Sequence, residues 1–278
     1  LAKVFADTDE NGEFDEEEDE LVAEYRYDGR GRRIEKVLTE AAGQSGSVAY
    51  YHNHAWQVLE ERFFDDEHEL ERVYQNVWSP RYIDALILRD ACDPATGAMV
   101  LPERLFYLAD ANYNVTSVVR ENPASPGEWH VVERYVYDPY GRVTVLNGHP
   151  TGDPDGLAAP QVYPEWSADP DGRSDRANTT LYTGRALDPE SGLMYYRARY
   201  YDAGLGAFIS RDPLRYNAGH NNLYHYCANS PANRVDPIGR DDIRIKAGTT
   251  DVVQWMPEGF LGIDQPSGAV DIGAVDRN

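Results

Sequence analysis

Short stretches in which apolar and polar residues alternate recur along most of the chain. Residues 24–28 alternate, residues 29–32 form a glycine-rich turn, and residues 34–38 resume the alternation. The same unit returns at 133–146, and a looser copy occupies 199–209. Alternation places every second side chain on one face of a strand, the aspartate before each turn can cap it, and glycine supplies positive φ. The pattern therefore predicts antiparallel hairpins.

Further strand candidates lie between these units, and two stretches break the rhythm. The additional strands are expected at residues 49–51, 56–62, 72–77, 82–89, 105–108 and 115–120. Residues 147–180 have few apolar anchors and many Pro, Gly and Asp residues, which predicts a mobile surface insertion. Residues 241–278 differ in composition and are too few for an independent core, so we interpret them as a truncated module.

The composition agrees with an all-β chain. Twenty tyrosines favour pleated, half-buried surfaces, and 17 prolines with 23 glycines provide frequent turns. The two cysteines, Cys92 and Cys227, are far apart and indicate neither a disulfide framework nor a zinc site.

The charge is strongly acidic. The sequence has 48 acidic and 26 basic residues, a net charge of −22, which disfavours nucleic acid as a partner. No apolar run approaches the length of a membrane span. The chain starts at Leu1 with no signal peptide pattern, so we expect a piece of a longer polypeptide.

Residues 7–18 fit a twelve-residue calcium loop of the EF type. Gly12 stands at the sixth position, where a sharp turn is needed, and so many carboxylates are costly to bring together without a divalent cation. We expect a structural Ca²⁺ here, because no amphipathic helix pair flanks the loop. The alternative is a solvated acidic hairpin tip. The expected ligands are Asp7, Asp9, Asn11, Glu13 through its carbonyl oxygen, Asp15 and Glu18.

Residues 181–240 carry a dense series of short motifs in a fixed order. They include Thr-Gly-Arg at 183–185, Tyr-Tyr-Arg-Ala-Arg-Tyr-Tyr-Asp at 195–202, Arg-Asp-Pro at 211–213, Asn-Ser-Pro at 229–231 and Val-Asp-Pro-Ile-Gly at 235–239. This series resembles the RHS repeat-associated core domain along its whole length. The Tyr-Asp-x-x-Gly hairpins upstream resemble the YD repeats of the same family, which also includes Tc toxin C subunits and teneurins.

The resemblance implies an architecture and a function. YD hairpins at 1–146 would form part of a β-shell, followed by the insertion at 147–180. A short helical or irregular core plug would occupy 181–240, and a variable tail 241–278. Such a protein would be bacterial, secreted or at the cell surface. It would encapsulate or display its C-terminal module, and its partners would be the rest of its own shell and that module.

The resemblance also implies self-cleavage by an aspartate pair. The family's two Asp-Pro elements match Asp212 and Asp236, which are 24 residues apart, and Arg199 matches the family's arginine 13 residues before the first. One carboxylate would act as base and one carboxylic acid as proton donor, while the arginine orients a carboxylate or stabilises the oxyanion. The bond cut would be Arg240–Asp241.

Two departures from the family pattern favour a different function. Arg215 stands where the first motif has glycine, and Arg240 stands where the second is followed by leucine. In this alternative the chain is a non-enzymatic cell-surface, adhesion or wall-associated scaffold, and both Asp-Pro pairs only form turns. A third interpretation makes the tail a toxin, but residues 248–278 show no catalytic pattern.

Overall fold

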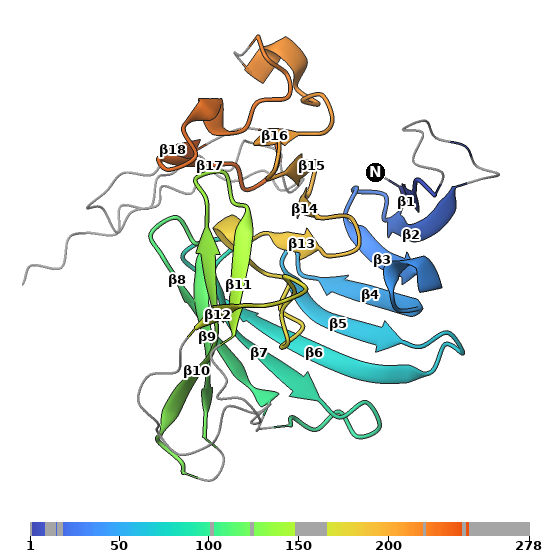
Figure 1. Ribbon diagram of the computed structural model, residues 1–278, viewed down its shortest axis with the longest axis vertical. Helices are drawn as coiled ribbons and strands as arrows, with labels where there is room; N and C mark the ends of the chain where they lie inside the picture. The colour runs from blue at the N-terminus through green and yellow to red at the C-terminus, as the bar shows by residue number, and fades with distance from the viewer. Residues whose placement is uncertain are drawn as a thin grey trace, which may run out of the picture.

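A single antiparallel sheet of twelve strands forms most of the molecule (Figure 1). The computed structural model describes residues 2–8, 15, 19–100, 103–122, 125–147, 166–218, 221–240 and 243–244. Each strand of the large sheet pairs only with its neighbours in the chain. The strands are β1 (Lys3–Ala6), β2 (Glu20–Tyr27), β3 (Arg33–Leu38), β4 (Gly46–His52), β5 (Val58–Phe64), β6 (Leu70–Trp78), β7 (Leu86–Cys92), β8 (Leu105–Ala109), β9 (Val115–Glu121), β10 (Trp129–Tyr137), β11 (Val143–Asn147) and β12 (Ser167–Ala168).

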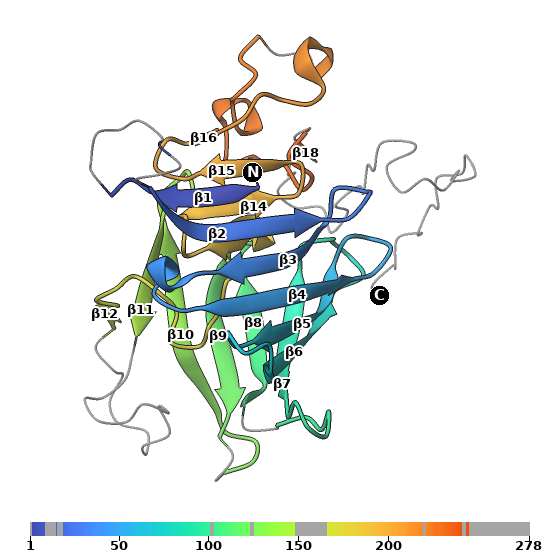
Figure 2. The same ribbon diagram turned by 90° about the vertical axis from the view of Figure 1, so that its right-hand side faces the viewer.

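The large sheet curves into a wall, and a second sheet lies across one end of it (Figures 1 and 2). The second sheet contains β13 (Ala186–Asp188), β14 (Leu193–Tyr196), β15 (Arg199–Asp202) and β16 (Ala207–Phe208), and β17 (Arg234–Val235) pairs with β18 (Ile243–Arg244). Among the described residues, the 3-10 turns whose bounds are defined are Glu40–Ala42, Tyr182–Gly184, Arg215–Ala218 and Cys227–Asn229. The all-β prediction with an irregular C-terminal part is confirmed.

The predicted aspartate turns join the strands of the wall. Asp28 accepts hydrogen bonds at Oδ1 from the backbone N–H groups two and four residues later, both at 2.9 Å. Asp138 repeats the arrangement with the same two distances. Gly31 and Gly141 take the left-handed positions, at φ +80° and +91°. Each turn is therefore fixed by its own aspartate and glycine, as the sequence indicates.

The same turn recurs where no glycine marks it. Asn53 Oδ1 and Asp110 Oδ1 each accept the equivalent pair of backbone hydrogen bonds. Trp56 and Tyr113 occupy the left-handed positions there, at φ 65° and 62°. The capping side chain, rather than glycine, is what these hairpins share.

Tyrosines on the inner face of the wall pack against the second sheet. The rings of Tyr25 and Tyr200 stack at 5.8 Å between centroids, and the hydroxyls of Tyr27 and Tyr200 are 2.8 Å apart. The Tyr201 hydroxyl donates to the Tyr140 carbonyl at 2.6 Å. Aromatic bodies thus fill the space between the sheets while their hydroxyls find partners.

Two buried carboxylates tie the second sheet to the wall. Asp188 of β13 lies 2.5 Å from Arg33 Nη1 and 3.3 Å from Lys36 Nζ, both on β3. Asp84, in the loop between β6 and β7, pairs with two arginines that follow in the chain. Arg185 Nη1 lies 2.7 Å and Arg197 Nη2 lies 2.6 Å from its Oδ1. Each contact joins residues more than 100 positions apart in the chain.

Residues 166–180, the described part of the predicted insertion, make specific side-chain contacts with the wall. Ser174 donates to the buried Glu133 carboxylate at 2.6 Å, Arg89 donates to the Ala177 carbonyl at 2.7 Å, and Asn147 donates to Asp169 at 2.6 Å. Short polar side chains here have partners on the inner face of the wall, which a count of apolar anchors does not reveal. Residues 148–165 lie outside the described residues, and the three expected boundaries between the four segments remain predictions.

Gly184 lies in the turn before β13, close to Asp84 of the wall, and its replacement by alanine is expected to destabilise the fold by about 2 to 4 kcal/mol. Its φ is +70°, and an added Cβ would lie 1.9 Å from the Asp84 carbonyl oxygen. Urea unfolding measures the loss. Gly192 is the matched control, because it has φ +69° but open space around it, so Gly192→Ala should cost only about 1 to 2 kcal/mol. Equal losses for the two variants would contradict the steric argument.

Candidate functional site

The three residues expected to act in self-cleavage meet at one point. Arg199 lies on β15, Asp212 follows β16, and Asp236 follows β17. Arg199 Nη2 is 3.1 Å from Asp212 Oδ2 and 3.3 Å from Asp236 Oδ2. All three side chains are at most 4% exposed. The structure therefore places both carboxylates on the same guanidinium nitrogen, away from bulk water.

Each aspartate also forms a turn with its other oxygen. Asp212 Oδ1 accepts the N–H of Leu214 at 2.7 Å, and Asp236 Oδ1 accepts the N–H of Arg240 at 3.1 Å. The same two side chains thus form turns and also contact Arg199, so the turn role and the site role are compatible. Capping fixes the orientation of each carboxylate and leaves its Oδ2 directed at Arg199.

Arg199 is held on every side. Its Nε donates to the Gly239 carbonyl at 2.5 Å, its Nη1 donates to the Leu223 carbonyl at 3.3 Å, and the guanidinium stacks on the Phe208 ring at 3.6 Å from the centroid. Burial lowers the pKa of Arg199 from its ordinary value, and the charges of Asp236 and Asp212 oppose that shift. The guanidinium is a fixed positive group beside both acids.

One guanidinium nitrogen contacts both carboxyl groups of this cluster. Two carboxyl groups held close together are costly to ionise at the same time. A cluster of this kind can hold one carboxylate and one carboxylic acid side by side, which is the pairing that acid–base hydrolysis of a peptide needs.

The two departures from the family pattern are visible in the structure. Arg215 is exposed and left-handed, with φ 54°, and its N–H donates to the Asp212 carbonyl at 3.0 Å. The conformation at this position explains why the family prefers glycine there. Arg240 is exposed, so its charge is solvated. Asp241 lies outside the described residues.

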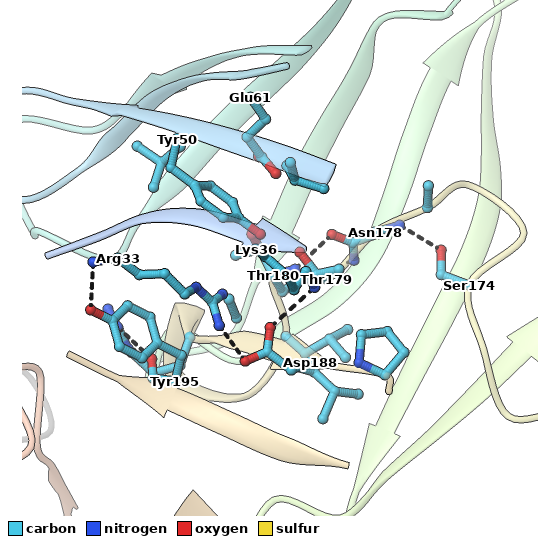
Figure 3. Close-up of a pocket in the computed structure, with 18 of the residues that line it drawn as sticks. Arg33, Lys36, Tyr50, Glu61, Ser174, Asn178, Thr179, Thr180, Asp188 and Tyr195 are labelled. Carbon is cyan, nitrogen blue, oxygen red and sulfur yellow. Dashed lines mark hydrogen bonds and ion pairs between the residues drawn. The ribbon is translucent and has the colours of Figure 1, made fainter. Parts of the chain in front are cut away.

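A separate cavity of about 550 Å³ lies between the inner face of the wall and the residues that lead into the second sheet (Figure 3). Charged and apolar residues both line it, and Arg33, Lys36, Glu61 and Asp188 are among the charged ones. Arg199, Asp212 and Asp236 are not among them. The cavity and the aspartate site are therefore different places in the molecule.

Most of the expected calcium loop lies outside the described residues. Asp7 and Asp15 are described, but Asp9, Asn11, Glu13 and Glu18 lie outside the described residues. Within the described ranges, no group of three or more His, Cys, Asp or Glu side chains is placed to hold a metal. In the same ranges no helix has the length and apolar character needed to cross a membrane.

Sequence reasoning did not identify Asp84, Arg185 and Arg197 as a cluster. The two arginines lie inside the motifs quoted above, but Asp84 lies in a segment predicted to be a strand. The signal that could have drawn attention is an aspartate within an otherwise apolar run, because such a carboxylate must find a buried partner.

Comparison with known proteins gives relatives along most of the chain. No family model matches. Tse5, a toxin protein of Pseudomonas aeruginosa, is 28% identical over 220 residues, which cover 79% of this chain and 15% of that protein. The tRNA nuclease WapA of Bacillus subtilis is 26% identical over 225 residues, covering 80% of this chain and 8% of the nuclease. The chain thus spans less than a sixth of either relative.

The wall has the fold of a solved toxin complex. The crystal structure of TcdB2-TccC3 superposes with a TM-score of 0.56 and 21% identity, covering 86% of this chain and 10% of that one. At this identity the likeness concerns the fold alone. The motifs at 181–240, the capped hairpins of the wall and the similarity to these proteins together support the RHS/YD-repeat family for this chain, with the fold of an RHS-type shell.

Proposed function

We propose that this chain closes an RHS shell, encloses or displays a variable C-terminal segment, and cuts itself from that segment after Arg240. The observation that carries the proposal is the contact of Arg199 Nη2 with both Asp212 Oδ2 and Asp236 Oδ2, at 3.1 and 3.3 Å in a buried site. Asp236 Oδ1 also holds the N–H of Arg240, so the site adjoins the bond to be cut.

Enclosure of a segment is supported by the shape of the molecule. The wall is curved, and the second sheet lies across one end (Figures 1 and 2). A cavity lies on the inner side (Figure 3). The two relatives quoted above, which match about four fifths of this chain, are named a tRNA nuclease and a toxin protein. A secreted or surface-delivered toxin protein is the setting that these similarities support.

The chemistry is the hydrolysis of one peptide bond. An ionised carboxylate of the pair takes a proton from water while the water oxygen bonds to the Arg240 carbonyl carbon. The protonated partner donates to the departing nitrogen of Asp241, and the carbon–nitrogen bond breaks. The products are a new carboxyl group at Arg240 and a new amino group at Asp241. Arg199 keeps the acids in place and offsets negative charge during the reaction.

A single slow turnover suffices for such a reaction. The bond and the aspartates belong to one chain, so folding brings the groups together and no substrate has to be bound. The rate should therefore be first-order and independent of protein concentration.

The test is to express the full-length protein and look for a fragment that begins at Asp241. Amino-terminal sequencing and intact mass identify the cut, and a dilution series shows whether it is intramolecular. A product that stays intact, or a rate that rises with protein concentration, would overturn the proposal. An intact product would instead favour the scaffold function, which the Arg215 and Arg240 departures support.

The calcium loop at residues 7–18 remains a proposal that rests on its ligand spacing. Addition of Ca²⁺ to chelator-treated protein is expected to raise the melting temperature by several degrees, because a ligand that binds only the folded state stabilises it. The Asp7→Asn variant should lose most of this shift. A shift below about 1 °C in the parent protein would indicate a solvated acidic tip instead.

A further inference from the structure

Three consecutive carbonyl oxygens before the proposed cut are each held by one of three consecutive residues, two in the turn between β14 and β15 and one at the start of β15. Arg197 Nη1 donates to the Pro237 carbonyl, the Ala198 N–H donates to the Ile238 carbonyl at 3.3 Å, and Arg199 Nε donates to the Gly239 carbonyl at 2.5 Å. Residues 197, 198 and 199 therefore contact residues 237, 238 and 239 in the same order. The next carbonyl along the chain is that of Arg240, the one to be attacked.

Gly239 allows this close approach. Its φ is +68°, and an added Cβ would lie 2.3 Å from the Tyr196 carbonyl oxygen. The segment before the cut therefore lies directly on the turn, with no room for a side chain between them. A slip of one residue would place Arg240 or Ile238 in this space, so the close contact permits one register only.

Arg197 is in turn fixed by the wall. Its Nη2 lies 2.6 Å and its Nη1 3.3 Å from the two carboxylate oxygens of Asp84. The Asp84 side chain is fully buried, and Arg185 Nη1 lies 2.7 Å from its Oδ1. The same Nη1 atom contacts both Asp84 and the Pro237 carbonyl. The Arg197 guanidinium thus connects Asp84 of the wall to Pro237 in the segment before the cut.

We propose that Asp84 and Arg197 are positioning residues, through which the assembled wall sets the register of residues 237–239 and so selects the Arg240–Asp241 bond. The inference rests on the proposed function and adds a condition to it. Without the wall, Arg185 and Arg197 would be two buried cations with no shared anion, and like charges in a buried place repel. The site is then complete only after the wall has formed around it.

Two substitutions test this in the full-length protein. Arg197→Lys keeps the positive charge but has a single ammonium in place of the planar fork that spans Asp84 and Pro237. Asp84→Asn removes the shared anion. Each is expected to slow the cut by about 100-fold, since small misplacements of reacting groups have effects of this size. Each is also expected to yield some fragments that begin beside Asp241 rather than at it.

The control is Asp90→Asn, which removes another largely buried, arginine-paired carboxylate from the wall. Asp90 lies on β7 and pairs with Arg104 at 2.6 Å. This variant should cut at Asp241 alone, whatever its stability, because general destabilisation does not move the cleavage point. Near-ultraviolet circular dichroism and a thermal melt report whether each variant is folded. If Asp84→Asn fails to fold, Arg197→Lys alone decides.

The outcomes separate the inference from the proposed function. Slower cutting with displaced fragment ends supports the positioning role. Cutting by Arg197→Lys at the parent rate and at Asp241 alone overturns the positioning role and leaves the proposed function standing. Slower cutting at Asp241 alone, equal to that of Asp90→Asn, also overturns it. A parent protein that is never cut overturns both.

Discussion

Replacement of Asp236 by asparagine is expected to slow self-cleavage about 1000-fold or more, since positioned acid–base groups contribute on the order of 10² to 10⁴ in rate. Asparagine has the same shape and can still accept the Arg240 N–H that Asp236 Oδ1 accepts at 3.1 Å. It can neither take a proton from water nor give one to the leaving nitrogen. The fold should survive while the chemistry stops.

The measurement is the fraction of full-length protein cut over time, read from intact mass. The matched control is Asp138→Asn, because Asp138 also precedes a proline and caps a turn but lies in a hairpin of the wall. If both variants retain a tenth or more of the parent rate, Asp236 is only a turn residue and the aspartate mechanism is wrong. A loss confined to Asp236→Asn shows that the carboxyl group itself is needed.

Replacement of Asp188 by asparagine is expected to destabilise the protein by about 3 to 5 kcal/mol, the usual consequence of breaking a buried ion pair. The side chain of Asp188 is 1% exposed, and those of Arg33 and Lys36 are 4% and 8% exposed. The variant would leave Arg33 with no carboxylate, and Lys36 with Glu190 at 3.2 Å as its remaining acidic partner. The second sheet would lose its main attachment to β3.

This loss should depend on pH in a defined direction. Burial acts to raise the pKa of Asp188, but the charges of Arg33 and Lys36 outweigh burial and hold the pKa below its usual range. A carboxylate of this kind stabilises the fold above its unfolded pKa, and the stabilisation disappears as pH falls through the folded pKa. The difference between parent and Asp188→Asn is therefore largest near neutral pH and shrinks in acid.

Urea unfolding at neutral and acidic pH measures both effects. Glu35→Gln is the control. Glu35 lies on β3, the strand that carries Arg33 and Lys36, and pairs with Arg26 in a solvent-exposed contact at 2.7 Å. That pair should contribute no more than about 1 kcal/mol. If Asp188→Asn costs no more than Glu35→Gln at neutral pH, the buried contact does not hold the second sheet in place.

The hairpins with an aspartate before a glycine could be predicted, because the signal is local. Asp28 and Asp138 cap turns within four residues, and the turn chemistry is readable from the sequence. Trp56 and Tyr113 could not be assigned in the same way. Their left-handed conformation follows from the capping by Asn53 and Asp110, and bulky residues at such positions carry no turn signal of their own.

The segment 82–89 shows how a distant partner overrides a local pattern. Its alternation predicts a strand, but β7 begins only at Leu86, and Tyr82 to Ala85 form a turn. Asp84 lies in that turn because Arg185, 101 residues later, binds its carboxylate. Strand propensity depends on context that a single segment does not contain.

The members of the aspartate site followed from the family motif, but their arrangement did not. Spacing alone could not show that Arg199 contacts both acids and the Gly239 carbonyl at once. These contacts depend on how β15, the segment after β16 and the segment after β17 fold over one another. Such packing has no counterpart in the one-dimensional pattern.

The neighbour-to-neighbour order of the wall has a consequence for the timing of synthesis. Since each strand from β1 to β12 pairs with the strand made just before it, the wall can form progressively while the ribosome is still translating the chain. Residues 181–240 are translated only after all twelve strands, and they contain both aspartates of the site and the two arginines that bind Asp84. A cut that requires them can therefore occur only after the wall has been made.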